Sequence, residues 1–307
     1  MMGDRVDTRV IGGLLPLGGY RLHAEFREPP AQFAGCFTTF YHLALDLDDP
    51  ASRVTDYLQP EWGNIRFFCG SVPDAQIGAI RVSGAPFVAT GPSALPCRFT
   101  LGPVRMWGVG FLPLGWARFM RSDARSCANI VCDGAAHSAF QHFAGLADTL
   151  CNPQASMDEQ FDAIVNAMTQ MMRPTRDDAR IARVHRELVN SEHASVRDLA
   201  DSCAMSIRML ERLSTKYFGF APKLLMRRQR FMRSLTTYML QRGSHWTEAM
   251  DAHYHDQAQF TREFHEFMTM NPSEYAAFDH PILKSFMEAR ARMWGSAAQT
   301  LDVAPPT

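Results

Sequence analysis

The sequence predicts a two-domain α+β protein, with a β-rich, sandwich or barrel-like N-terminal domain followed by an all-α C-terminal domain. Three observations support this prediction. Up to about residue 120, short apolar runs alternate with Gly and Pro; from about residue 136, apolar residues recur at helical spacing; and the last third of the chain repeats itself at an offset of 50 residues. A length of 307 residues fits about two domains.

Composition and charge narrow the class of protein. With 46% hydrophobic and 21% charged residues, the chain can bury real cores and is not mostly disordered. A net charge of −1 excludes a polycationic binder but permits a local basic face. The seven cysteines are scattered and form no C-x-x-C pair, so we expect reduced thiols rather than a disulfide framework. Neither a signal peptide nor a membrane span is expected, and a cytoplasmic location follows from these points.

Residues 1–135 are predicted to form the β-rich domain. The apolar runs at 37–44, 65–69 and 106–112 are bounded by turn residues, as is typical of antiparallel strands in a sandwich or barrel. Aromatic side chains here either fill the core or line an apolar effector pocket. We expect core filling to dominate, because alternate strand residues must be buried. These aromatics are Trp62, Phe67, Phe68, Phe87, Phe99, Trp107, Phe111 and Trp116.

Residues 136–175 are predicted to be connecting helices. Each carries an apolar stripe that packs on the β domain or pairs with a second subunit. Pro174 ends the second helix, and residues 173–178 form a linker. The two stripes are Phe140, Phe143, Ala144, Ala147 and Leu150, and Phe161, Ile164, Val165, Met168 and Met172.

Residues 176–280 contain the repeat. Shifting the sequence by 50 residues aligns like with like, which predicts two tandem copies of one three-helix unit. The matches place Val196, Leu199 and Ala200 on Trp246, Ala249 and Met250, Leu210 on Phe260, Arg212 on Arg262, and Pro222 on Pro272.

Each unit has a helix-turn-helix pattern. In the first, Ser195 and Asp198 form a capping box, and Ser206 caps the second helix after a tight turn. In the second unit, Asp256 is the expected cap. We expect Ile207, Leu210, Leu213 and Tyr217 to face inward in the first unit, and Phe260, Phe264, Phe267 and Met268 in the second. The outward positions are Arg208, Glu211, Arg212 and Thr215, and Ala258, Thr261, Arg262 and His265.

Such a second helix suits the DNA major groove, where arginine binds guanine and polar side chains contact other base edges. Two units on one monomer would enter adjacent groove segments about 34 Å apart. The basic helix between them, residues 223–230, is predicted to contact phosphates through Arg227 and Arg228. Neutralising either residue should then flatten the salt dependence of DNA binding.

The residues of both units resemble the DNA-binding domain of AraC/XylS-type regulators. Residues 195–222 are similar to its first half, and residues 255–264 with 270–275 are similar to its second-half signature. The resemblance implies DNA contacts by Ser206, Arg208, Glu211 and Arg212 on the first recognition helix, and by Gln257, Ala258, Gln259, Thr261 and Arg262 on the second.

The N-terminal half resembles the family only in short segments. Residues 58–68 and 108–115 look like parts of the β-rich sensor domains of some members. The resemblance implies a small-molecule effector or dimer contacts in this domain. It also implies a homodimer on double-stranded DNA, and RNA polymerase as a further partner.

Several positions depart from the family pattern. Ala204 and His253 stand in turns where glycine is usual, and a positive φ is then expected at His253. Ser214 replaces a usual buried phenylalanine, and Ala258 replaces a usual polar reader. We therefore expect a less rigid first unit and fewer bases read by the second.

The function predicted from these motifs is a sequence-specific DNA-binding transcription regulator rather than an enzyme. No metal or cofactor is expected: the N-terminal histidines lack ligand spacing, His253 and His255 fall in a predicted turn, and no phosphate-loop or nucleophile motif follows a strand. Two alternatives remain, a catalytic β domain regulated by the helices and a protein-interaction module. Residues 281–307 are predicted to form an amphipathic helix with a disordered tail from Asp302.

Overall fold

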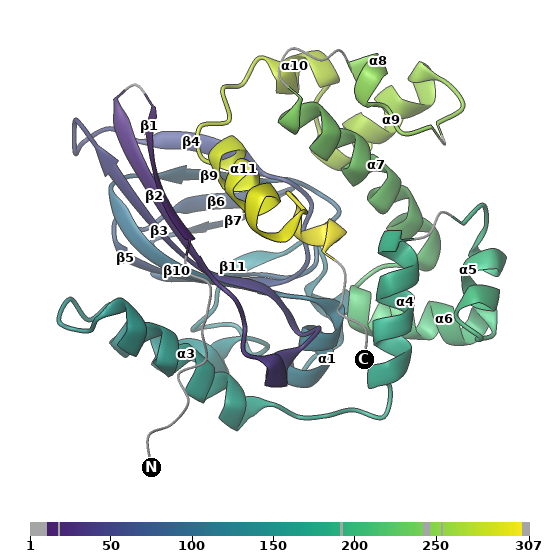
Figure 1. The fold of residues 1–307 in the computed structure, drawn as a ribbon, viewed down its shortest axis with the longest axis horizontal. Coiled ribbons are helices and arrows are strands. Elements are labelled where there is room, and N and C mark those ends of the chain that lie inside the picture. Colours follow the sequence, from purple (N-terminus) through teal and green to yellow (C-terminus); the bar gives the residue numbers. More distant parts are fainter. Residues whose placement is uncertain (1–10, 18, 191–192, 242–245, 253, 303–307) are drawn as a thin grey trace.

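The structure is a computed structural model, and it describes residues 11–17, 19–190, 193–241, 246–252 and 254–302. Its N-terminal half contains two antiparallel sheets, and its C-terminal half is helical, which confirms the predicted fold class (Figure 1). The larger sheet has the strand order β1 (Ile11–Leu17), β2 (Tyr20–Arg27), β3 (Phe37–Leu47), β10 (Val104–Phe111), β5 (Asn64–Gly70), β8 (Phe87–Thr90) and β11 (Val131–Asp133). The smaller has the order β4 (Val54–Leu58), β9 (Cys97–Leu101), β6 (Asp74–Ile77) and β7 (Ile80–Ser83).

Burial along the strands follows their position. In the edge hairpin, β6 alternates exposed and buried residues, while β3 and β5 in the large sheet are buried along most of their length. The hairpin pairs Ile77 with Ile80, and Gly78 takes a φ of +56° in the tight turn between them. The central strands are covered on both faces, which explains their continuous apolar runs.

Helical segments between and after the strands cover one face of the large sheet. Trp107 on β10 donates its indole N–H to Gln160 Oε1 of α3 at 2.6 Å, and the ring of Phe161 lies 5.9 Å from that of Phe40. The apolar stripe of α3 therefore packs on the β domain. These elements are η1 (Ala31–Phe33), α1 (Pro113–Phe119), η2 (Ala124–Cys127), η3 (Gln141–Leu146), α2 (Ala147–Leu150) and α3 (Met157–Met171).

One expectation about the cysteines is wrong. Cys69 at the end of β5 and Cys151 after α2 form a disulfide, although all seven cysteines were expected to be reduced. The two residues are 82 positions apart and follow no local motif, so only the packing of α2 against β5 brings them together. The other five cysteines are free: Cys36, Cys97, Cys127, Cys132 and Cys203.

The helical half reproduces the 50-residue offset in its helix starts. Helices that begin at Val196, Ile207 and Pro222 recur at Trp246, Gln257 and Pro272. The first set is α5 (Val196–Ser202), α6 (Ile207–Leu213) and α7 (Pro222–Leu240), preceded by α4 (Asp178–Asn190). The second set is α8 (Trp246–Ala249), α9 (Gln257–Met268) and α10 (Pro272–Ala276). In Figure 1 the two units lie at opposite ends of α7.

The unusual residues of the first unit have visible backbone consequences. Ala204 adopts a φ of +52° in the turn between α5 and α6, at the position where AraC/XylS-type regulators usually have glycine. Ser214 begins a π-helical turn, η4 (Ser214–Phe218), and its buried hydroxyl has no hydrogen-bond partner in the described part of the chain. His253, where a positive φ was also expected, lies outside the described residues.

The C-terminal segment packs on the β domain. Helix α11 (Leu283–Trp294) crosses the open side of the strands, and η5 (Gln299–Leu301) follows it (Figure 1). Asp302 was predicted to begin a disordered tail, but it is buried and its carboxylate pairs with Arg290 of α11. Residues 303–307 lie outside the described part. None of the described helices combines the length and apolar character needed to cross a bilayer.

Candidate functional site

The first candidate DNA-reading surface is the outer face of α6. The hydroxyl of Ser206 accepts a hydrogen bond from the backbone N–H of Met209 at 3.2 Å, so it caps the helix as predicted. Leu210 and Leu213 are buried beneath the helix. Ile207 was expected to be buried but is 36% exposed, because the first turn of α6 extends past the core. Four predicted contact residues are exposed on this unit: Ser206, Arg208, Glu211 and Arg212.

The second surface is the outer face of α9. Asp256 caps this helix by accepting from the N–H of Gln259 at 2.6 Å, and the predicted inward residues are buried. Gln257, Ala258 and Arg262 are exposed, whereas Gln259 and Thr261 are half-buried. The inward residues are Phe260, Phe264, Phe267 and Met268. Both helices thus present an arginine on an exposed face over an apolar base.

The prediction that Arg228 faces DNA phosphates is wrong for this conformation. Its side chain is fully buried, with the guanidinium 3.8 Å from the ring centre of Trp62 and one N–H donating to the backbone oxygen of Ser93 at 2.9 Å. Burial lowers the pKa of Arg228 to about 9. The residue therefore joins α7 to the β domain, a contact across 135 residues of sequence that no local pattern announces.

Arg227, the other predicted phosphate contact, is largely engaged within the protein. Its guanidinium binds Glu263 at 2.9 Å and also Glu266, both on α9, and Arg230 binds Glu263 at 2.7 Å. These ion pairs fasten the second unit to α7. A hollow of about 590 Å³ lies between the units, and its cationic lining includes Lys223, Arg227, Arg230 and Arg233.

A second buried group at the same junction gives a pH prediction. His185 of α4 is 1% exposed and packs against Trp62; burial, reinforced by Arg228, lowers the pKa of His185 to about 3. In the unfolded chain the pKa is about 6.5, so between pH 6.5 and pH 3 the unfolded state binds a proton that the folded state excludes. Stability is therefore lost as pH falls, by roughly 2 kcal/mol between pH 6.5 and pH 5.

Urea unfolding at pH 7, 6 and 5 measures this loss. His185→Leu should reduce the dependence of unfolding free energy on pH, whereas His265→Leu, at an exposed position, should leave that dependence as in the wild type. Equal slopes for the wild type and His185→Leu would contradict this assignment.

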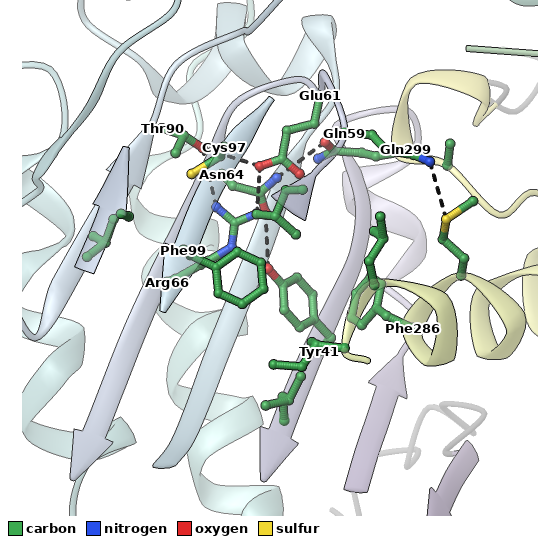
Figure 2. A pocket seen from close by; sticks show the side chains of 18 of the residues that line it. Tyr41, Gln59, Glu61, Asn64, Arg66, Thr90, Cys97, Phe99, Phe286 and Gln299 are labelled. Atoms are coloured by element: carbon green, nitrogen blue, oxygen red, sulfur yellow. Dashed lines mark hydrogen bonds and ion pairs between the residues drawn. The ribbon is translucent and has the colours of Figure 1, made fainter. Parts of the chain in front are cut away.

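The N-terminal half contains a cavity. It lies between the two sheets, has a free volume of about 110 Å³, and is closed on one side by α11. Figure 2 shows Arg66 in its wall, between Glu61 and Tyr41, with Phe286 of α11 facing Tyr41. The rest of the lining is mainly apolar, and includes Leu43, Phe68, Val88, Phe99, Leu101, Met106 and Val131.

The charges at this cavity are internally compensated. The Arg66 guanidinium binds Glu61 at 2.6 Å and donates to the Tyr41 oxygen at 2.9 Å. Burial alone would lower the pKa of Arg66, but Glu61 beside it raises that pKa above its ordinary value. Burial raises the pKa of the Cys97 thiol to about 12, so this thiol is neutral. Arg290, the other cation in the lining, is paired with Asp302.

Sequence reasoning assigned no role to Arg66, although a signal exists. An arginine inside the apolar run at 65–69 must be buried with the strand, and a buried cation needs a carboxylate or comparable partner. Which carboxylate serves it depends on the path of the chain before β5, where Glu61 lies. Two further lining residues, Phe286 and Gln299, come from the C-terminal end of the chain. Nothing in the sequence around them indicates that they line this cavity.

Solved structures of ToxT resemble this chain. A 1.65 Å structure of ToxT from Vibrio cholerae matches with 10% identity, 84% of this chain, 97% of that chain and a TM-score of 0.39. Wild-type ToxT from Vibrio cholerae with a bound unsaturated fatty acid matches with 13% identity, 75% and 96% coverage and a TM-score of 0.37. The AraC-like transcriptional activator CuxR matches with 12% identity, 74% and 86% coverage and a TM-score of 0.31.

Comparison with family models found no match, and comparison with curated proteins found none either.

Proposed function

We propose that this protein is a sequence-specific DNA-binding transcription regulator whose β domain responds to a small molecule. The observation that carries the proposal is the duplication: helix starts recur at an offset of 50 residues, and the second helix of each unit bears an exposed arginine, Arg212 or Arg262. A single amphipathic helix with charged outer residues is an ordinary surface feature. Two equivalent helices at opposite ends of α7 form a repeated reading element, which suits two adjacent major-groove segments.

The hollow between the units has an exposed cation, Lys223, at its rim, in a position suited to a DNA phosphate. Arg227, Arg230 and Arg233 also line the hollow, but their guanidinium groups pair with the carboxylates of Glu263, Glu266 and Asp251. Phosphate contacts supply affinity that does not depend on sequence and position the protein on the duplex. In the proposed complex Lys223 takes the phosphate-binding role that the sequence had suggested for Arg228. A homodimer, contact with RNA polymerase and a cytoplasmic location remain part of this proposal.

The proposal is tested by selecting bound sequences from a random duplex library with the full-length protein, followed by footprinting of the selected site. We expect two short sequence elements whose centres lie about one helical turn, roughly 10 base pairs, apart. A pair of such sites would indicate a dimer. Binding to heparin together with the absence of any enriched sequence would overturn the proposal and favour a protein-interaction module.

A further inference from the structure

We propose that the C-terminal segment 281–302 is a built-in competitor for the β-domain cavity, and that a neutral, largely apolar molecule with one carbonyl oxygen displaces it. This inference rests on the proposed function, because it describes how the effector site of the regulator is controlled. Its central observation is that the cavity already holds a ligand-like group from the same chain, the carboxamide of Gln299.

Gln299 is held as a bound carbonyl would be. Its side-chain oxygen accepts from the backbone N–H of Trp62 at 3.1 Å and from the amide of Asn64 at 3.2 Å. The approach is close: a Cβ at position 110 would lie 2.3 Å from Nε2 of Gln299 and 2.5 Å from Oγ1 of Thr38, so alanine there would displace these side chains. By contrast, this Nε2 donor is buried and has no hydrogen-bond partner in the described part of the chain. The site thus matches the oxygen of Gln299 but not its nitrogen, as expected of a site built for a carbonyl.

The segment is anchored at both ends of the cavity. Asp56 of β4 accepts from the backbone N–H groups of Ile282 and Leu283, each at 2.8 Å, at the start of α11. In the middle of the segment, the ring of Phe286 lies 5.0 Å from that of Tyr41, on the lining of the cavity (Figure 2). At the far end, Arg290 and Asp302 form a buried ion pair that closes η5 against α11. Between these anchors, the segment supplies the apolar wall that a bound molecule would replace.

The free space is too small for a typical effector while the segment is in place. Its volume of about 110 Å³ is below the roughly 150 Å³ of an apolar cavity that holds one benzene molecule. Entry of an aromatic ring with a carbonyl substituent therefore requires the Gln299 side chain to leave its present position, and we propose that η5 leaves with it. Binding of such a molecule and release of the segment are consequently coupled.

The paired charges favour a neutral occupant. A carboxylate would have to compete with Glu61 for Arg66 or with Asp302 for Arg290, and would bring an additional charge into a buried site. A carbonyl oxygen needs only the two donors that Gln299 now uses. An aromatic ketone therefore fits the recognition chemistry better than a carboxylate of the same shape.

Release of the segment would reach the DNA-binding half directly. The side-chain amide of Gln229 on α7 donates to the backbone oxygen of Thr300 at 2.6 Å, and α11 follows α10 of the second unit without an intervening domain. Trp62 contacts both the C-terminal segment and α7. Its backbone N–H donates to Gln299, and its ring lies under Arg228 of α7. Displacing Gln299 thus removes one of the ties between the cavity and α7.

The test uses three probes of similar size: acetophenone, benzoate and ethylbenzene, titrated into the full-length protein by ligand-observed NMR. We expect acetophenone to bind more tightly than the other two. Gln299→Ala, which removes the internal competitor, should strengthen acetophenone binding about tenfold, and Gly110→Ala should act in the same direction. Asn64→Leu should weaken binding of acetophenone, and Gln154→Ala, at an exposed turn residue, should change nothing.

Hydrogen exchange measures the displacement itself. Saturating acetophenone should increase exchange of the amides in 283–302, relative to the same protein with benzoate. Equal acetophenone affinity in the wild type and Gln299→Ala, tighter binding of benzoate, no detectable binding of acetophenone, or unchanged exchange in 283–302 would each overturn the inference. The selection of bound DNA sequences is performed without any of the three probes. Failure of the regulator proposal can therefore be distinguished from failure of the internal-competitor proposal.

Discussion

Replacing Arg262 with alanine is expected to weaken binding to the selected DNA site about 5- to 150-fold, the equivalent of about 1–3 kcal/mol, and to relax specificity at one base pair. Arg262 is exposed on the outer face of α9, above the buried Phe260 and Phe264, so the substitution removes a contact without opening the core. A bidentate contact between arginine and guanine depends on the identity of one base, which explains why the loss is confined to one position.

Two matched variants separate the causes. Lys223→Gln, at the rim of the cationic hollow, should weaken all sequences alike and lower the salt slope by about 1, as expected for a single phosphate contact. Arg81→Ala removes an exposed arginine of β7, on the β domain, and should leave binding unchanged. The measurement is affinity for the selected site and for its single-base variants at three salt concentrations. Uniform weakening by Arg262→Ala would make Arg262 a phosphate contact instead of a base reader.

Truncating Arg228 to alanine should lower the free energy of unfolding by about 2–4 kcal/mol, because it leaves a void beneath Trp62 at the junction of α7 and the β domain. Arg228→Met should differ from the wild type by less than about 1 kcal/mol or be more stable. Methionine fills similar space and removes a buried cation whose Nε and one Nη have no hydrogen-bond partner in the described part of the chain. The favourable stacking on Trp62, worth about 2 kcal/mol, opposes this gain and keeps it small.

Denaturant unfolding of the two variants measures the difference, with Arg212→Met at an exposed position of α6 as the control, expected within about 0.5 kcal/mol of the wild type. The salt dependence of DNA binding should also stay the same in Arg228→Met, contrary to the expectation from the sequence. A flattened slope would mean that Arg228 leaves its buried site when DNA binds. If Arg228→Met were as destabilised as Arg228→Ala, the charge itself would be the stabilising element.

Local signals in the sequence were sufficient to predict the candidate DNA-reading surfaces of the helical half. The caps at Ser195, Ser206 and Asp256, the apolar stripes beneath the second helices and the proline that begins the last helix of each unit are set by neighbours within four residues. These interactions define where a helix starts and which face is apolar, and the structure places both as expected. Ile207 departs from the pattern. It lies on the apolar face of α6, but the first turn of this helix does not pack on the core.

Contacts between distant segments were not predictable in the same way. The basic run at 223–230 gives no indication that Arg228 turns inward while Lys223 turns outward, because both satisfy the composition of a phosphate-binding helix. The partner that decides the matter, Trp62, lies on the β domain. The disulfide between Cys69 and Cys151 depends in the same way on how separate segments pack, whereas the carboxylate that serves Arg66 belongs to Glu61, only five residues earlier.

The sequence by itself determined the β-rich and helical halves, the duplicated three-helix unit and the exposed arginines of its second helices, because periodicity, caps and turns act over a few residues. Only the tertiary structure decided which side of α7 is buried, that residues 281–302 return to cover the β-domain cavity, and that Gln299 occupies the donors of Trp62 and Asn64. Burial and pairing of charge are properties of the assembled interior. They become defined only when the chain packs and excludes water.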